Sequence, residues 1–318
     1  EARYLGQLLE GIRRQQLDHL EVETVVIDSG STDATLQVAR EHDCVVAHIR
    51  REDFSFGRSL NMGCEAAGGD IFVFVSGHCV PCDEHWLRQL CEPIVSGVAD
   101  YAYGRQVGGP ESRFSECRIF EKYYPRVSHI PQSGYFSNNA NSALSRTAWV
   151  AHHFDEELTG LEDMELAKRL CQAGGRVGYV AEAAVYHYHH ETWPQVKRRF
   201  EREAIALQRI MPQIHVSLVD LVRYVTSSIA HDLRQARRDG RATALIGEIA
   251  RYRIAQYLGS YKGNHQHRKL SRAEKDVYFY PTNRRNTHET IEVQGRRPAA
   301  DESQQREGAR QELPRVLR

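Results

Sequence analysis

The sequence lacks several features that would assign it to a class at once. No apolar run is long enough to span a bilayer, and the first residues, Glu-Ala-Arg-Tyr, show no signal peptide. The 42 basic residues balance the 42 acidic ones, so the net charge names no partner and gives no indication of nucleic-acid binding. A chain of 318 residues with 41% apolar content can bury one large core or two smaller ones. We therefore expect a globular protein that is soluble or peripheral to a membrane.

Cysteine pairs of the kind that form a zinc or redox motif are also missing. Cys79 and Cys82 lie close together, but no second pair completes a zinc site, and the helix context of a thioredoxin-type motif is absent. We interpret the seven cysteines as reduced structural thiols, which is typical of a cytosolic protein. The expected location is the cytoplasm.

The start of the chain lacks the strand that normally opens an α/β unit. Apolar residues at Ala2, Leu5, Leu8 and Ile12 follow a helical period, and the first clear strand comes only at residues 22–27. We therefore expect an N-terminal truncation that has removed a first strand.

The following residues alternate between strand and helix patterns. The strand at residues 22–27 ends in the turn-rich segment 28–33, and the apolar run 71–75 reads as a central parallel strand covered on both faces. That run stops at the segment 76–81. Because ligands of open α/β sheets bind beyond the carboxyl ends of strands, both segments should face one crevice. The pattern predicts a nucleotide-binding type of α/β half.

Carboxylates at the start of a later helix are the main candidates for chemistry. A helix is expected at residues 114–124, then an amide-rich loop with Asn138, Asn139 and Asn141, a strand at 142–145 and a helix after Thr159. Thr159 and Glu162 have capping-box spacing, so Glu162 is either a reciprocal helix cap or a second catalytic acid. Asp163 has no capping duty, and a first-turn carboxylate in a cleft can accept a proton.

Histidines follow the strands predicted at residues 177–180 and 184–188. Alternation places His187 and His189 on the same side of an extended segment, a spacing that lets two imidazoles approach one metal ion or one phosphate. The alternative is that these histidines are polar loop residues that bind no ligand.

Beyond Pro194 the chain becomes helical and basic. Apolar stripes such as Val196, Phe200 and Leu207 favour packing on a core. Arginines that alternate with these stripes leave open contact with an anionic membrane surface, for instance at the inner face of the membrane. After Pro281 aliphatic residues are few, and we expect residues 282–318 to be disordered.

Four segments together resemble family-2 glycosyltransferases with a GT-A fold, especially the bacterial rhamnosyltransferase-like branch. Residues 25–35 are similar to the family's "VVDSGSTDGT" segment, and residues 56–63 with 69–71 resemble its "HGRTRNLG…ARGE" segment. Residues 161–163 resemble its "ED" motif, whose Asp is the catalytic base. The resemblance covers roughly residues 1 to 195, and the combination is specific although each motif alone is common. It also implies that a first strand and a "TYN"-like segment should precede this chain.

The resemblance implies a Rossmann-like α/β fold with a mostly parallel sheet between helices. It implies a GT-A domain at residues 1–193, and the composition beyond it predicts a helical extension at 194–281. The activity implied is inverting transfer of a sugar from a nucleotide-sugar donor to a hydroxyl of a glycan or lipid-linked acceptor. Asp163 would be the base, with Glu162 as the second acid. The residues expected to contact the donor are Asp28, Ser29, Asp33, Arg58, Asn61, Ser76 and His78, and those expected to contact sugar hydroxyls or stack on a sugar are Asn138, Asn139, Asn141 and Trp193.

The chain departs from the family at its metal motif. Where the family has Asp-x-Asp, which binds a divalent cation and the diphosphate, this chain has Ser76-Gly77-His78. Either His78 shares an ion such as Mn²⁺ or Mg²⁺ with His187 and His189, or cationic side chains meet the diphosphate instead.

Two other classes stay open at this stage. Sugar nucleotidyltransferases also use a GT-A-like fold, but they normally carry a Gly-rich basic loop after the first strand. With the metal motif altered, the chain could instead be a non-catalytic nucleotide-sugar-binding or membrane-docking scaffold. The family resemblance suggests synthesis of a bacterial surface polysaccharide or glycoconjugate.

Overall fold

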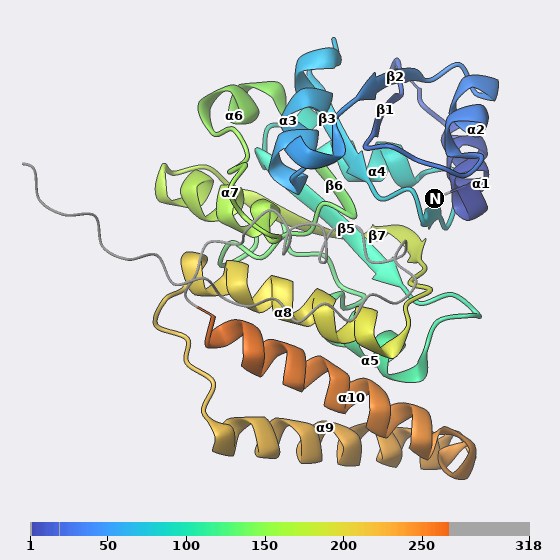
Figure 1. Ribbon diagram of the computed structural model, residues 1–318. Coiled ribbons are helices and arrows are strands. Elements are labelled where there is room, and N and C mark those ends of the chain that lie inside the picture. The colour runs from blue at the N-terminus through green and yellow to red at the C-terminus, as the bar shows by residue number, and fades with distance from the viewer. Residues whose placement is uncertain (1, 19, 267–318) are drawn as a thin grey trace, which may run out of the picture. The chain divides into compact units, whose positions relative to one another are not determined.

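The computed structural model describes residues 2–18 and 20–266 (Figure 1). The predicted disordered tail at 282–318 lies outside the described residues. The elements of the first 81 residues follow the predicted alternation. They are α1 (Ala2–Arg13), β1 (Val25–Asp28), α2 (Thr35–Glu41), β2 (Val45–His48), the 3₁₀ turn η1 (Arg51–Asp53), α3 (Phe56–Ala66), β3 (Ile71–Val75) and β4 (Cys79–Pro81).

The middle of the chain adds the remaining strands and four helices. These elements are α4 (Trp86–Val95), β5 (Tyr101–Val107), α5 (Phe114–Tyr123), β6 (Asn141–Ser145), α6 (Arg146–Ala151), α7 (Glu162–Gln172) and β7 (Val177–His187). Strands β1 and β2 form a parallel pair, and the other five form a sheet in the order β3-β6-β5-β7-β4. Fully buried aromatic side chains such as Tyr101 and Tyr179 anchor the core against this sheet.

The five-stranded sheet is mixed, so the expectation of a mostly parallel sheet was wrong in this respect. Of its described ladders only β5–β7 is parallel, whereas β3–β6, β5–β6 and β4–β7 are antiparallel. The predicted central parallel strand, β3, lies at one end of the strand order and pairs antiparallel with β6. It buries Phe72 and Phe74, while the alternate positions are only partly covered. An apolar run does not reveal strand direction, which depends on the strand that lies alongside, here β6.

The two strands predicted at residues 177–180 and 184–188 are one strand, β7, with an irregularity. Gly104 of β5 faces Val180, but the next residue, Arg105, faces Ala184, so three residues of β7 are left outside the register. Such a bulge bends a strand and re-aims the side chains that follow it. Here the strand that follows the bulge ends at His187.

Three helices follow the sheet: α8 (Trp193–Ile210), α9 (Leu218–Arg238) and α10 (Ala242–Asn264). Figure 1 shows them as successive layers below the α/β part. Helices α8 and α10 approach so closely at Gly259 that a Cβ atom there would collide with the backbone carbonyl of Lys197. A buried ion pair joins α9 to α10, with Arg253 Nε 2.7 Å from Asp232 Oδ2, and Ser115 of α5 donates to the same oxygen at 2.7 Å.

The apolar stripe of α9 is only partly packed against a core. Leu221 is buried, but Leu218, Val219 and Val222 are 63%, 76% and 58% exposed. Within the described residues, we find no helix that combines the length and apolarity needed to cross a bilayer.

Candidate active site

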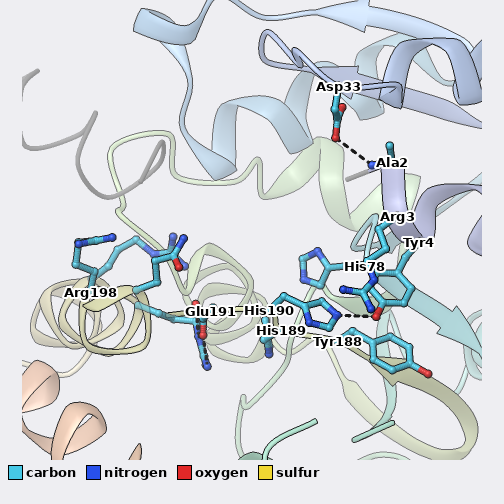
Figure 2. Close-up of a pocket in the computed structure, with 13 residues that line it drawn as sticks. Ala2, Arg3, Tyr4, Asp33, His78, Tyr188, His189, His190, Glu191 and Arg198 are labelled. Carbon is cyan, nitrogen blue, oxygen red and sulfur yellow. Dashed lines mark hydrogen bonds and ion pairs between the residues drawn. The ribbon is translucent and has the colours of Figure 1, made fainter. Parts of the chain in front are cut away.

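A cavity of about 420 Å³ lies where the start of α1, the loop after β1, the β3–β4 turn, the end of β7 and α8 meet. Its volume is in the range of small-molecule sites. The lining is rich in cationic and imidazole side chains (Figure 2). The lining residues are Ala2, Arg3, Tyr4, Asp33, His78, Tyr188, His189, His190, Glu191, Gln195, Arg198, Arg199 and Arg202.

Three histidines cluster at one side of this cavity, where His78 and His189 line it and His187 lies next to them. His78 lies in the β3–β4 turn, His187 ends β7 and His189 follows it. The backbone sets their spacing, since Cys79 pairs with His187 and the Tyr188 N–H donates to the His78 carbonyl at 3.2 Å. One ring nitrogen from each lies within 4.8 Å of the others. A divalent cation fits this donor set, because His187 Nε2 is buried with no hydrogen-bond partner among the described residues.

The start of α7 differs from the predicted capping box. The residue that caps the helix is Leu161, in the left-handed region at φ 56°, and it makes no side-chain cap. Thr159 donates its hydroxyl to the carbonyl of Arg202 at 3.0 Å instead, so Glu162 is not a reciprocal cap. Because Arg202 lines the cavity, this contact places the start of α7 beside its arginine wall.

Glu162 and Asp163 form a buried carboxylate pair, 7% and 5% exposed. Burial, with the Asp163 carboxylate beside it, raises the pKa of Glu162, and burial also raises the pKa of Asp163. Asp163 nevertheless accepts two backbone N–H groups, from Asn139 at 2.9 Å and from Met164 at 2.7 Å. Since such bonds stabilise a carboxylate anion, Asp163 is the member of the pair that ionises first. It does not itself line the cavity.

The amide segment divides into two different roles. Asn139 lies against Asp163, and its Nδ2 is buried with no hydrogen-bond partner in the described part of the chain. Asn138 Oδ1 accepts from Gln106 Nε2 at 2.8 Å. Asn141 is fully buried and does not face a substrate: its Oδ1 accepts from Trp86 Nε1, and its Nδ2 donates to the carbonyls of Arg105 and Ala183. These bonds join strands, so the prediction of a sugar contact by Asn141 was wrong.

The predicted nucleotide residues of the loop after β1 also separate. Asp33 lines the cavity, and its Oδ1 accepts from the backbone and hydroxyl of Thr35, which lowers its pKa. Asp28 is 5% exposed and accepts the N–H groups of Gly30 and Ser31. Burial opposes ionisation there, but these bonds outweigh it and the pKa of Asp28 is lowered. Ser29 stands between them in the same loop and does not line the cavity.

Asn61, like Asn141, is a structural residue in this fold. Its Nδ2 donates to Phe154 O at 3.0 Å and to Glu156 Oε1 at 2.9 Å, and its Oδ1 accepts from Trp149 Nε1 and Phe154 N. The hydrogen-bonding groups of this amide are thereby all used by α6 and the loop that follows it. The expected donor contact by Asn61 was therefore wrong.

Three further residues that were expected to contact the donor or a sugar do not line the cavity. Arg58 is exposed on the first turn of α3, and neither it nor Ser76 lines the cavity. Trp193 packs beside Val196 and Tyr252, with the Arg113 guanidinium 4.1 Å from its ring centroid. Packing therefore occupies the ring that was expected to stack on a sugar.

Sequence reasoning missed the cationic wall that α8 contributes. The arginines Arg198, Arg199 and Arg202 alternate with the first apolar stripe and left membrane contact open, but they line the cavity. Their spacing along one helix was visible, and only the fold shows that this face is turned inward. Gln106 of β5 and Glu116 of α5, which hold two of the histidines, gave no sequence signal.

Residues 1–146 match the family described as Glycosyl transferase family 2. The O-antigen chain rhamnosyltransferase RfbN of Salmonella typhimurium (strain LT2) is 26% identical over 209 residues, covering 58% of this chain and 62% of that protein. WbaN of Salmonella anatum, also named an O-antigen chain rhamnosyltransferase, is 25% identical over 189 residues, covering 56% and 60%. The chain thus spans about three fifths of the length of these two relatives.

A solved structure supports the fold. The mannosyltransferase PcManGT from Pyrobaculum calidifontis, in complex with GDP-Man and Mn²⁺, aligns with a TM-score of 0.57 and 16% identity, over 89% of this chain and 85% of that one. The predicted GT-A type of α/β fold with a helical C-terminal region is thereby confirmed. Residues 1–146 are thus similar to glycosyl transferase family 2, and the chain is similar to two bacterial O-antigen chain rhamnosyltransferases.

Proposed function

We propose that this protein is an inverting glycosyltransferase that moves a sugar from a nucleotide-sugar donor to an acceptor hydroxyl. The observation that carries this proposal is the cationic cavity beside a buried carboxylate pair. Arg3, Arg198, Arg199 and Arg202 line it with His78 and His189, against only two carboxylates, Asp33 and Glu191. Such a surface suits a diphosphate, which arginine binds through paired hydrogen bonds.

The leaving group of the proposed reaction is the nucleoside diphosphate. Negative charge grows on its oxygens as the bond to the anomeric carbon breaks, and preorganised cationic groups stabilise that charge most effectively. Arg198 and Arg202 come from successive turns of α8, which holds them without a loop that must close. A divalent cation held by His78, His187 and His189 would neutralise part of the same charge.

Asp163 is the proposed base, which takes the proton from the acceptor hydroxyl as its oxygen attacks the anomeric carbon. The two backbone N–H groups keep Asp163 ionised, while Glu162 keeps its proton. The start of α7 adjoins the cavity through Arg202, which supports this role. Asn139 Nδ2, a buried donor next to Asp163, is proposed to contact a sugar hydroxyl.

The acceptor is proposed to be a glycan or lipid-linked glycan of a bacterial surface polysaccharide, made at the cytoplasmic side of the membrane. The names of RfbN and WbaN support this step. The exposed apolar side chains Leu218, Val219 and Val222 stand beside Arg223, and the last turn of α9 carries Arg237 and Arg238. Basic amphipathic helices of this kind bind anionic bilayers, so we assign α9 as the membrane-facing element. Flotation with anionic vesicles should retain the protein, whereas a Val219→Asp variant should stay unbound.

Donor binding is tested by thermal shift with UDP-, GDP-, dTDP- and CMP-sugars. One of them should raise the melting temperature, since a ligand at about 100 times its Kd stabilises the native state by about 2.7 kcal/mol. Arg198→Ala should lose most of the shift. Arg209→Ala is the matched control on the same helix, because Arg209 is 44% exposed and pairs with Glu157 outside the cavity. No shift with any nucleotide sugar would contradict the proposal.

A further inference from the structure

Two of the three clustered histidines are held from behind by buried side chains of other elements. His187 Nδ1 lies 2.7 Å from Gln106 Oε1, and Gln106 Nε2 donates to Asn138 Oδ1 at 2.8 Å. The bond to Asn138 fixes which end of the Gln106 amide faces the ring. Because an amide oxygen only accepts, the His187 proton is on Nδ1 and its lone pair is on Nε2. That Nε2 is the buried atom without a hydrogen-bond partner in the described residues.

His189 is held in the same way by a carboxylate. Its Nδ1 lies 2.8 Å from Oε1 of Glu116, a residue of α5 that is only 2% exposed. Arg199 Nη2 lies 3.2 Å from the same oxygen and helps to hold Glu116 in place. The proton of His189 is then on Nδ1, which leaves Nε2 as its lone-pair nitrogen. Carboxylate and amide partners behind the second ring nitrogen are characteristic of histidines that bind metals.

The three rings stand close enough to share an ion. Their centroids are 4.9 Å apart for His78 and His187, 5.4 Å for His78 and His189, and 4.1 Å for His187 and His189. Nitrogens around a tetrahedral ion at about 2.1 Å are roughly 3.4 Å apart. Since the ligand atoms here lie within 4.8 Å of one another, an adjustment on the order of 1 Å closes the set.

The chemistry of the donors selects the ion. Imidazole nitrogens suit borderline transition metals, whereas Mg²⁺ and Mn²⁺ prefer carboxylate and other oxygen ligands. No carboxylate belongs to this three-ligand set as far as the structure is described. Three protein ligands also leave an open position, the arrangement found at catalytic rather than structural zinc sites.

We propose that His78, His187 and His189 form a three-imidazole site for a borderline dication of the Zn²⁺ type, with Gln106 and Glu116 as positioning residues. This inference deepens the proposed function, because the ion would stand at the wall of the same cavity. It changes the expected metal from the Mn²⁺ or Mg²⁺ of the family motif to an ion that nitrogen ligands bind well. It also explains why an Asp-x-Asp motif can be absent while a cation site persists.

Metal binding to the full chain, stripped with a chelator, tests the proposal without any transfer reaction. Calorimetric titration with ZnCl₂ should give one tight site, at least about 100-fold tighter than with MgCl₂ or MnCl₂. CoCl₂ should give the intense visible absorption of a four-coordinate ion. His187→Ala and His189→Ala should abolish both signals. Equal affinity for Mg²⁺ and Zn²⁺, or a six-coordinate Co²⁺ spectrum, would overturn the proposal.

Two further variants separate positioning from folding. Glu116→Gln should weaken Zn²⁺ binding by about 10- to 100-fold, the usual effect of altering the partner of a metal-bound histidine. His190→Ala is the matched control, since His190 lines the same cavity but bonds to Tyr4 OH at 2.6 Å. It should keep full Zn²⁺ affinity. If His190→Ala loses as much affinity as His189→Ala, the proposed ligand set is wrong.

The two proposals fail in different ways. Tight Zn²⁺ binding without a thermal shift from any nucleotide sugar, with the metal added back, would keep the metal site and contradict the glycosyltransferase function. A nucleotide-sugar shift that persists in excess chelator, together with no Zn²⁺ binding by calorimetry, would keep the function and contradict the metal site.

Discussion

Replacing Asp163 by Asn is the sharpest perturbation of the proposed chemistry. The substitution removes the proton acceptor, and a positioned general base contributes about 10²- to 10⁴-fold to a rate. At about 1.4 kcal/mol for each factor of ten, this is roughly 3–5 kcal/mol of the barrier. The Asn side chain also places an NH₂ group opposite one of the two backbone N–H groups from which Asp163 accepts hydrogen bonds. Losing that bond should lower the stability of the fold by about 1–3 kcal/mol. Circular dichroism must therefore show that the variant is folded.

The assay is release of nucleoside diphosphate or transfer to acceptor, measured as kcat against pH. Burial raises the pKa of Asp163, so the acid limb of the wild-type profile should lie above the range of an ordinary Asp, about 3.9. Activity should fall as pH decreases through that limb, because the base becomes protonated. Asp163→Asn should lower the rate at every pH while leaving the donor's thermal shift intact. Near wild-type turnover in this variant would refute the assignment of the base.

Glu162→Gln is the matched control for the acid limb. Glu162 is still protonated when Asp163 titrates, so the neutral amide should leave the position of that limb unchanged. A limb that moves would show that Glu162 is the residue that ionises first. Glu162 also affects the stability of the protein. Because folding raises the pKa of this carboxyl group, the folded state loses stability as pH rises through that pKa. Glu162→Gln should therefore gain stability over the wild type on the alkaline side, as measured by urea unfolding.

Three further predictions concern the scaffold and use unfolding measurements. Arg253→Met should lower the free energy of unfolding by about 3–5 kcal/mol, because it leaves the Asp232 carboxylate buried without its cation. Adding Asp232→Leu to the same chain should recover part of this loss. Gly259→Ala should destabilise the protein where α10 meets the α8 backbone, whereas Gly247→Ala, with open space around its Cβ, should stabilise α10 by about 0.5–1 kcal/mol. Asn141→Ala should cost about 1–3 kcal/mol by leaving its buried partners unpaired, and preserved stability would reopen its assignment as a substrate contact.

Local patterns were sufficient to predict most elements. The helix expected at 114–124 is Phe114–Tyr123, and the strand expected at 142–145 is Asn141–Ser145. Apolar periodicity is a property of neighbouring residues and needs no knowledge of partners. The direction of β3 and the bulge in β7 depend on which strand lies alongside, so no local pattern reveals them.

Residue type alone also misjudged the asparagines. Asn61 and Asn141 have the donors and acceptors that a sugar needs, yet the fold uses them for its own backbone and for the side chains of Trp86, Trp149 and Glu156. Asn139 has the same chemistry and keeps a buried Nδ2 without a hydrogen-bond partner in the described residues. The three asparagines differ in how many of their hydrogen-bonding groups already have partners within the protein, and only the folded arrangement determines this.

The histidines show how a partly correct motif becomes a site. Alternation placed His187 and His189 together, and the family's metal position pointed to His78. What makes them usable is Glu116, and Glu116 is held by Arg199 of α8, which in turn packs on α10. A boundary at residue 193 separates the recognisable motifs from the helices, but it cuts through the cavity wall. Helix α8 is therefore part of the proposed site, since it supplies three of the four arginines that line the cavity and holds Glu116 behind His189.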